Sequence, residues 1–149
     1  MRSILLCLLL ALPATLAAQQ AKLYVLGPWD GGTNNIAAAS TNTVSGSDIA
    51  CSEFDHIGIE VTVRPVTTST GTVIFKFAES VSGSAYETTP SHTLTVTLSG
   101  TNAITSVVDY SIPTAGTFAL VQTVSTNAMA MTNVVVYARF KSPKMHPSF

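Results

Sequence analysis

Apolar and polar residues alternate with a period of two along most of the chain after residue 53. The clearest run is FDHIGIEVTVRP at residues 54–65, in which Ile57, Ile59, Val61 and Val63 alternate with polar or small residues. A period of two places one set of side chains on one face of a β-strand and the other set on the opposite face. The pattern therefore predicts a strand with one buried and one wet face, ended by its final proline.

Further runs of the same kind follow, and a short one precedes them. The turn sequence Ser99-Gly100-Thr101-Asn102 separates two of these runs and predicts a hairpin between them. No segment after the first twenty residues has a helical period of useful length. The predicted strands are residues 23–26, 54–64, 72–78, 94–98, 104–110, the stretch around Phe118 and Leu120, and 133–141.

Short strands separated by turn residues are typical of sandwiches, jelly rolls and barrels. Strands with one buried face and one solvent-exposed face are typical of antiparallel sheets. The sequence therefore predicts an all-β fold, an antiparallel β-sandwich or jelly roll of about seven to eight strands with an extended N-terminal arm. The arm is residues 18–53, which hold one short strand and a small, polar, nearly uncharged stretch from Gly32 to Ser47. The core is 54–141 and the tail is 142–149.

The first twenty residues, MRSILLCLLLALPATLAAQQ, have the order of a secretion signal. Arg2 precedes a short apolar run, and small residues follow Pro13. We predict a signal peptide at 1–17, cleaved after Ala17 or Ala18; an uncleaved anchor or a buried N-terminal element is the alternative. The apolar run is about nine residues long and a spanning helix needs about 20, so no stable membrane span is expected after signal removal. Bacterial-type export to a secreted or extracytoplasmic location follows, with a virion as the alternative.

Charge and cysteine content narrow the class of protein. Charged residues make up 10% of the chain and the net charge is −1, without a clustered basic surface. Nucleic-acid binding needs such a surface, so no nucleic-acid partner is expected. Of the two cysteines, Cys7 lies in the predicted signal, which leaves Cys51 without an intrachain disulfide partner in the mature chain.

The sequence contains no catalytic or nucleotide-binding motif of the common types. Its densest polar cluster is Cys51, Glu53, Asp55, His56 and Glu60. Glu53, His56 and Glu60 are the metal-ligand types that could converge there, but His56 and Glu60 lie four residues apart on one strand face, roughly 13 Å apart. They cannot share one metal without a fold-back. Asp109 with Glu79 or Glu87 could form the paired carboxylates of a glycosidase, but no spacing in the sequence supports either pair. We therefore expect no enzyme activity, no catalytic or metal-binding residues and no cofactor.

Two aromatic residues are the candidate contacts for a ligand or partner. Trp29 lies in a Pro-Trp-Asp-Gly turn, where it could stack on a sugar, anchor a partner or plug the end of the sandwich. Tyr86 follows the Ser/Gly turn region after the run at 72–78. Cys51, placed among carboxylates, is expected to be a buried or idle thiol. The row Thr93, Thr95 and Thr97 is expected to be the outer face of a strand.

One stretch resembles the small β-sandwich structural proteins of tailed bacteriophages and prophages. FDHIGIEVTVRP followed by TVIFKFAESVSGSAYETTP is similar to their passage from a core strand into a Gly turn and an aromatic residue, over about residues 54–90. Ser82 stands where Asp is usual. The resemblance implies a structural role on a virion or surface, and the N-terminal signal departs from it. The matching positions are Ser80, Gly83, Tyr86 and Glu87.

The sequence supports two functional hypotheses. The first is a non-enzymatic structural or assembly protein that self-associates on a particle or cell surface, as a virion decoration or fibre-like protein or an exported surface protein. Its partners would be copies of itself or other structural subunits, contacted through the N-terminal arm and through edge strands that few charges protect. The second is a secreted binding module for a glycan or another surface ligand.

Overall fold

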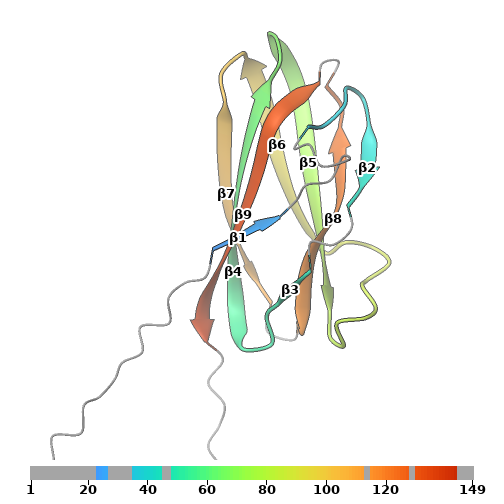
Figure 1. Cartoon of the computed structure of the whole chain (residues 1–149), viewed down its shortest axis with the longest axis vertical. Helices are drawn as coiled ribbons and strands as arrows, with labels where there is room; N and C mark the ends of the chain where they lie inside the picture. The colour runs from blue at the N-terminus through green and yellow to red at the C-terminus, as the bar shows by residue number, and fades with distance from the viewer. Residues whose placement is uncertain (1–22, 27–34, 45–47, 113–114, 128–129, 144–149) are drawn as a thin grey trace, which may run out of the picture.

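The fold is known from a computed structural model, which describes residues 23–26, 35–44, 48–112, 115–127 and 130–143. Within these residues there are nine strands and no helix (Figure 1). The strands are β1 (Leu23–Leu26), β2 (Thr41–Thr43), β3 (Ile49–Ala50), β4 (Phe54–Pro65), β5 (Ser69–Ser80), β6 (His92–Gly100), β7 (Ile104–Ser111), β8 (Thr117–Ser125) and β9 (Met131–Pro143).

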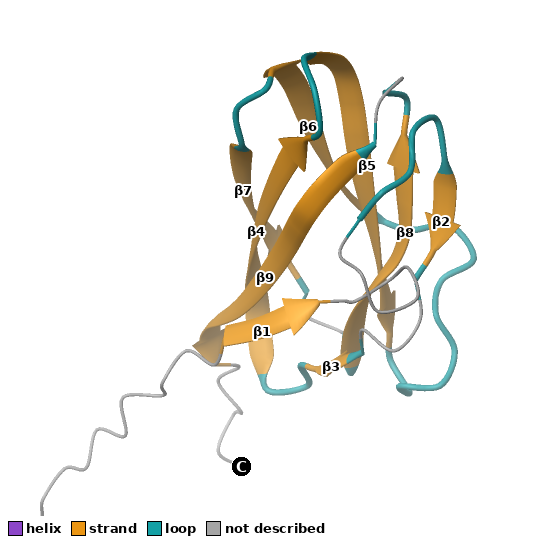
Figure 2. Ribbon diagram, turned by 45° about the horizontal axis from the view of Figure 1, so that its top comes forward, coloured by secondary structure: helices purple, strands orange, loops and turns teal. Residues whose placement is uncertain are grey.

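The strands form two facing antiparallel sheets (Figure 2). One sheet has the order β1-β9-β4-β7 and the other β2-β8-β5-β6, with β3 pairing beside β2 on the same edge of β8. If β2 and β3 are counted as two pieces of one edge strand, the chain has eight strands. Numbered 1 to 8 along the chain, they have the sheet orders 1-8-3-6 and 2-7-4-5. This is the jelly-roll arrangement of two interlocked Greek keys. The predicted all-β antiparallel sandwich or jelly roll is confirmed.

The core lies between the sheets and follows the alternation in the sequence. Four alternating apolar residues of β4 are fully buried, and Val73, Phe75 and Phe77 of β5 oppose them across the gap. On β9, Val134, Val136 and Ala138 are also fully buried. The long strands β4, β5 and β9 therefore each contribute one apolar face, and removal of these faces from water is the main stabilising term of the fold.

The predicted hairpin between residues 94–98 and 104–110 is wrong. β6 pairs with β5, and β7 pairs with β4 in the other sheet, so the connection crosses from one layer to the other. Each of the two strands has one apolar face. Because the strands lie in opposite sheets, these faces pack against each other and are both removed from water. The crossing turn uses Gly100 with φ +86°, a left-handed conformation that glycine adopts without strain.

Part of the region before residue 54 packs onto the sandwich. β2 and β3 pair with β8, and Ile36 makes a backbone bridge to Met131. Ile36 and Ile49 are 0% and 2% exposed, so this region adds apolar side chains to the core. Among the described residues, none belongs to a helix long and apolar enough to cross a membrane.

Candidate functional site

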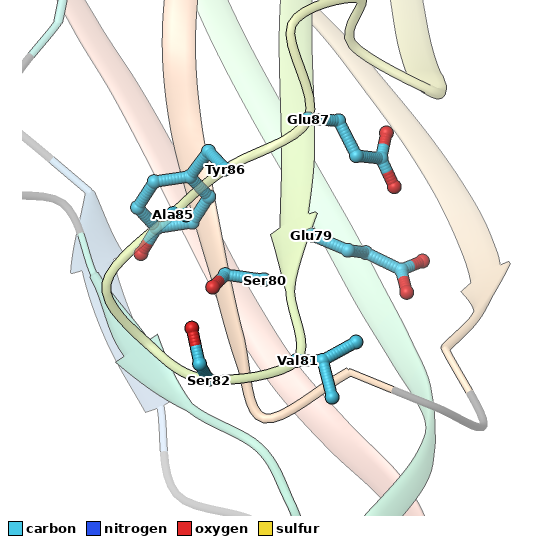
Figure 3. Close-up of a pocket in the computed structure, with 7 residues that line it drawn as sticks. All are labelled: Glu79, Ser80, Val81, Ser82, Ala85, Tyr86 and Glu87. Atoms are coloured by element: carbon cyan, nitrogen blue, oxygen red, sulfur yellow. The ribbon is translucent and has the colours of Figure 1, made fainter.

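A shallow pocket of about 340 Å³ lies where the loop after β5 folds back on the end of that strand (Figure 3). The Gly83 amide donates to Ser80 Oγ at 2.9 Å, and the Glu87 amide donates to the Glu79 carbonyl at 3.3 Å. These two bonds return the loop to the strand. The pocket is lined by Glu79, Ser80, Val81, Ser82, Ala85, Tyr86 and Glu87.

Tyr86, a predicted contact residue, lines this pocket, but its hydroxyl is enclosed. The Tyr86 hydroxyl lies near the Thr117 hydroxyl and near Asp48, and neither hydroxyl makes a full hydrogen bond within the described residues. Burial raises the pKa of the Tyr86 phenol, and the Asp48 carboxylate raises it further. A ligand in the pocket would therefore meet the ring of Tyr86 and the loop around it, and not the Tyr86 hydroxyl. Its role as a ligand contact stays a prediction.

On the other side of the strand end, His92 and Glu79 form a partly buried pair. His92 Nε2 and Glu79 Oε1 are 2.5 Å apart, and the two side chains are 16% and 14% exposed. The imidazole ring lies 4.6 Å from the ring of Tyr110 and 5.6 Å from that of Phe118, centre to centre. In Figure 3 the carboxylates of Glu79 and Glu87 point to the same side, away from Tyr86. The imidazole of the pair thus packs on one ring from the opposite sheet and one from its own sheet.

Sequence reasoning did not find the His92–Glu79 pair, although its signal was present. Glu79 has the same parity as Val73, Phe75 and Phe77 on β5, and His92 has the same parity as Leu94 on β6. Parity assigns both polar side chains to the inner face. A buried polar group needs a hydrogen-bond partner. At this strand end, each of the two side chains supplies the partner of the other.

Tyr110 lies on the inner face of β7, and its enclosed hydroxyl makes no hydrogen bond within the described part of the chain. Burial raises the pKa of this phenol to about 12. The folded state thus holds the hydroxyl neutral, whereas the unfolded chain releases the proton near pH 10. The contribution of this neutral phenol to the free energy of unfolding is fully present below pH 10. It is lost as the pH rises toward 12, the pKa of the folded state.

Replacing Tyr110 with phenylalanine is therefore expected to leave stability at pH 7 unchanged or raised by up to about 1 kcal/mol, because the ring stays and an unpaired buried hydroxyl is removed. Between pH 10 and 12 the variant is expected to lose less stability than the parent chain. Urea unfolding at pH 7 and pH 11 measures both effects, with Tyr137→Phe on the outer face as the control. A clear loss of stability at pH 7 would contradict the unpaired hydroxyl.

The structure places the other candidates apart from one another. Trp29 lies outside the described residues. Glu53, His56 and Glu60 are exposed, the last two on the outer face of β4. No group of three or more His, Cys, Asp or Glu side chains in the described ranges is close enough to hold a metal ion. The polar cluster in the sequence therefore does not become a cluster of ligands in the described structure.

Neither Cys51 nor Asp109 is among the residues that line the pocket. Cys51 is 1% exposed, and its thiol donates to the Ala115 carbonyl at a sulfur–oxygen distance of 3.7 Å. Asp109 is exposed on the outer face of β7, opposite Gly58, while Glu79 points inward from β5. The considered pairing of Asp109 with Glu79 therefore puts the two carboxylates on different faces of the sandwich.

The hydroxyl row of β6 has the orientation that the alternation predicts. Thr93, Thr95 and Thr97 are exposed, and Leu94, Val96 and Leu98 between them are buried. β6 is the terminal strand in the order β2-β8-β5-β6, so among the described strands its backbone is paired on the β5 side only. The strand presents a row of hydroxyls beside a free sheet edge.

Comparison with known proteins gives a structural neighbour and no family. No protein-family model matches the chain, and neither does any curated protein. A chain of the cowpea mosaic virus top component, described as naturally occurring empty particles, has 15% sequence identity and a TM-score of 0.41. The similar part covers 67% of this chain and 64% of that one. This chain is thus similar to a viral particle protein at a level that assigns it no function, and the resemblance to tailed-phage proteins stays a prediction.

Proposed function

We propose that this chain is a non-enzymatic structural module that assembles with copies of itself, on a virus particle or an exported cell surface. The observation that carries the proposal is the unprotected edge of β6. A free edge is a template for pairing with another chain, and single-chain proteins usually blunt it with lysine, proline, a bulge or a covering loop. β6 holds no Lys, Arg, Asp, Glu or Pro, and its register with β5 is unbroken.

The chemistry of the polar pair agrees with a structural role. His92 already uses Nε2 for Glu79, and the rings of Tyr110 and Phe118 pack on its imidazole. A general base needs a substrate proton within hydrogen-bond reach. Since the Glu79 carboxylate already occupies Nε2 of His92, this interaction links the start of β6 to the end of β5 and leaves Nε2 without a role as a base. The jelly roll itself hosts capsid, lectin and other proteins, so the fold alone does not choose among functions.

The test is the molar mass of the native protein by size-exclusion chromatography with light scattering across a range of concentrations. We expect a dimer or larger assembly whose share rises with concentration, because edge pairing is intermolecular. A chain that stays monomeric at every concentration would overturn the proposal. If that monomer also bound members of a glycan panel, the alternative of a secreted glycan-binding module would take its place, with the pocket beside Tyr86 as its site.

A further inference from the structure

The four edges of the two sheets differ in length and charge. β2 and β3 share one edge with only three and two residues, and β1 has four. β7 has eight residues and carries Asp109 on its exposed face. β6 has nine residues without a formal charge in Thr93–Gly100. Of the edges in the described structure, β6 is the longest, and it holds no Lys, Arg, Asp or Glu, which makes it the best template for a further strand.

The neighbouring strand of the other sheet adds apolar surface to this side of the molecule. Ile104, Val108 and Tyr110 of β7 pack against the core but are only partly buried. Val107 lies on the outer face of the same strand, away from this rim, and is 67% exposed. A partner laid along β6 would lie next to this half-covered rim. Burial of such surface favours association.

We propose that two copies of the chain pair antiparallel along β6, about a twofold axis through Val96. This inference rests on the proposed function and identifies the surface that would carry it. Centring the axis on Val96 lets all nine residues of β6 pair, since His92 then lies opposite Gly100 of the partner subunit. The four strands β2-β8-β5-β6 continue into those of the second copy as one sheet.

The side-chain pattern of β6 fits this register. Leu94 lies opposite Leu98 of the partner subunit on the inner face, and Thr95 lies opposite Thr97 of the partner subunit on the outer face. A shift by one residue would put apolar side chains opposite the hydroxyls and on the wrong face, so only even shifts keep both cores intact. Opposed threonines are a favourable cross-strand pair. The strand is thus complementary to itself.

The nearest cation on this face of the described residues does not oppose the pairing. Lys76 lies one strand inward on β5, opposite Thr93. Strands in a sheet are about 4.8 Å apart, so Lys76 is roughly 10 Å from the strand of a second copy. The two Lys76 side chains lie toward opposite ends of the ladder because the axis passes through Val96. On the outer face, the centre of the proposed interface therefore contains hydroxyl groups and no charged side chain.

The experiment uses charge to test the edge and the register together. In Thr95→Lys/Thr97→Lys, each new lysine faces a lysine of the other copy, and like charges directly opposite are destabilising. We expect the dimer dissociation constant to rise by at least about tenfold. In Thr95→Glu/Thr97→Lys, each glutamate faces a lysine of the other copy, so dimerisation is expected to return. Both positions are exposed, and thermal melts check that the variants fold.

The control and the outcomes separate this inference from the proposed function. Val107→Lys puts one lysine on the outer face of the neighbouring edge strand and should leave the dimer intact. An assembly that survives the double lysine variant but breaks with Val107→Lys would overturn the β6 edge and keep self-association. Failure of the glutamate–lysine variant to restore the dimer would overturn the register. Should the lysine variant unfold, concentration-dependent hydrogen-exchange protection of β6 amides in the parent chain decides: protection supports the edge, and its absence overturns it.

Discussion

Replacing Phe77 with alanine is expected to lower the free energy of unfolding by about 3–5 kcal/mol, the largest effect of a single substitution considered for this chain. Phe77 is fully buried. Its ring lies 5.5 Å from Phe118 and 6.0 Å from Tyr110, centre to centre, so it joins β5, β7 and β8 in one aromatic cluster. The loss combines the transfer free energy of the ring with a cavity between two sheets that cannot fully close.

Two matched variants identify the cause of that loss. Phe77→Leu retains most of the volume and should cost clearly less than the alanine variant. Phe54→Ala removes a ring that stacks on Phe140 at 4.6 Å but is only partly buried, so its cost should also be smaller. Urea unfolding curves with equal slopes give the comparison. A Phe77→Ala loss below that of Phe54→Ala would contradict the central place of Phe77 in the core.

The long strands could be predicted because burial leaves its period in the sequence. In β4 the apolar residues occupy every second position, since one face meets the core and the other meets water. Strand existence therefore followed from the pattern, and so did the outward direction of Thr95 on β6. Strand pairing did not follow, because alternation says which face is buried but not which sheet a strand joins. The wrong hairpin between β6 and β7 is the direct result.

Short strands escape the same reasoning. β2 and β3 have three and two residues, too few to show any period. Their pairing with β8 depends on backbone hydrogen bonds and on the single buried anchor Ile49, while the buried Ile36 before them bridges to Met131 of β9. An isolated apolar residue in a polar stretch does not reveal what it packs against. The polar stretch before residue 54 therefore shows its place in the fold only in three dimensions.

The candidate site was accessible to sequence reasoning in part. Tyr86 was predicted as a contact residue and does line the pocket beside Ser80. The pair of Glu79 and His92 needed one further step, which was to ask why a carboxylate and an imidazole each stand at an inner-face position. Their contact spans 13 residues and the whole loop between them, so parity supplies the direction of each side chain and only the folded loop supplies the distance.

Replacing Gly116 with alanine is expected to destabilise the fold by about 2–3 kcal/mol. A Cβ atom at this position would lie 2.3 Å from the Val81 carbonyl oxygen, and the next nearest atoms are also backbone, so no side-chain rotation relieves the clash. The Gly116 amide donates to the Ser80 carbonyl at 2.8 Å, and its carbonyl accepts from the Cys51 amide at 2.9 Å. Moving this backbone strains three segments at once.

Gly100→Ala separates this clash from the ordinary cost of replacing a glycine. Gly100 has φ +86° and no neighbour within 4 Å of its added Cβ, so conformational strain of about 1 kcal/mol is its whole expected cost. The two variants should also differ locally. Gly116→Ala is expected to speed hydrogen exchange at the Glu87 amide, whose bond to the Glu79 carbonyl holds the pocket loop, because that loop starts at the displaced Val81. Equal losses of stability in the two variants, with unchanged exchange at Glu87, would show that the backbone around Val81 yields without cost.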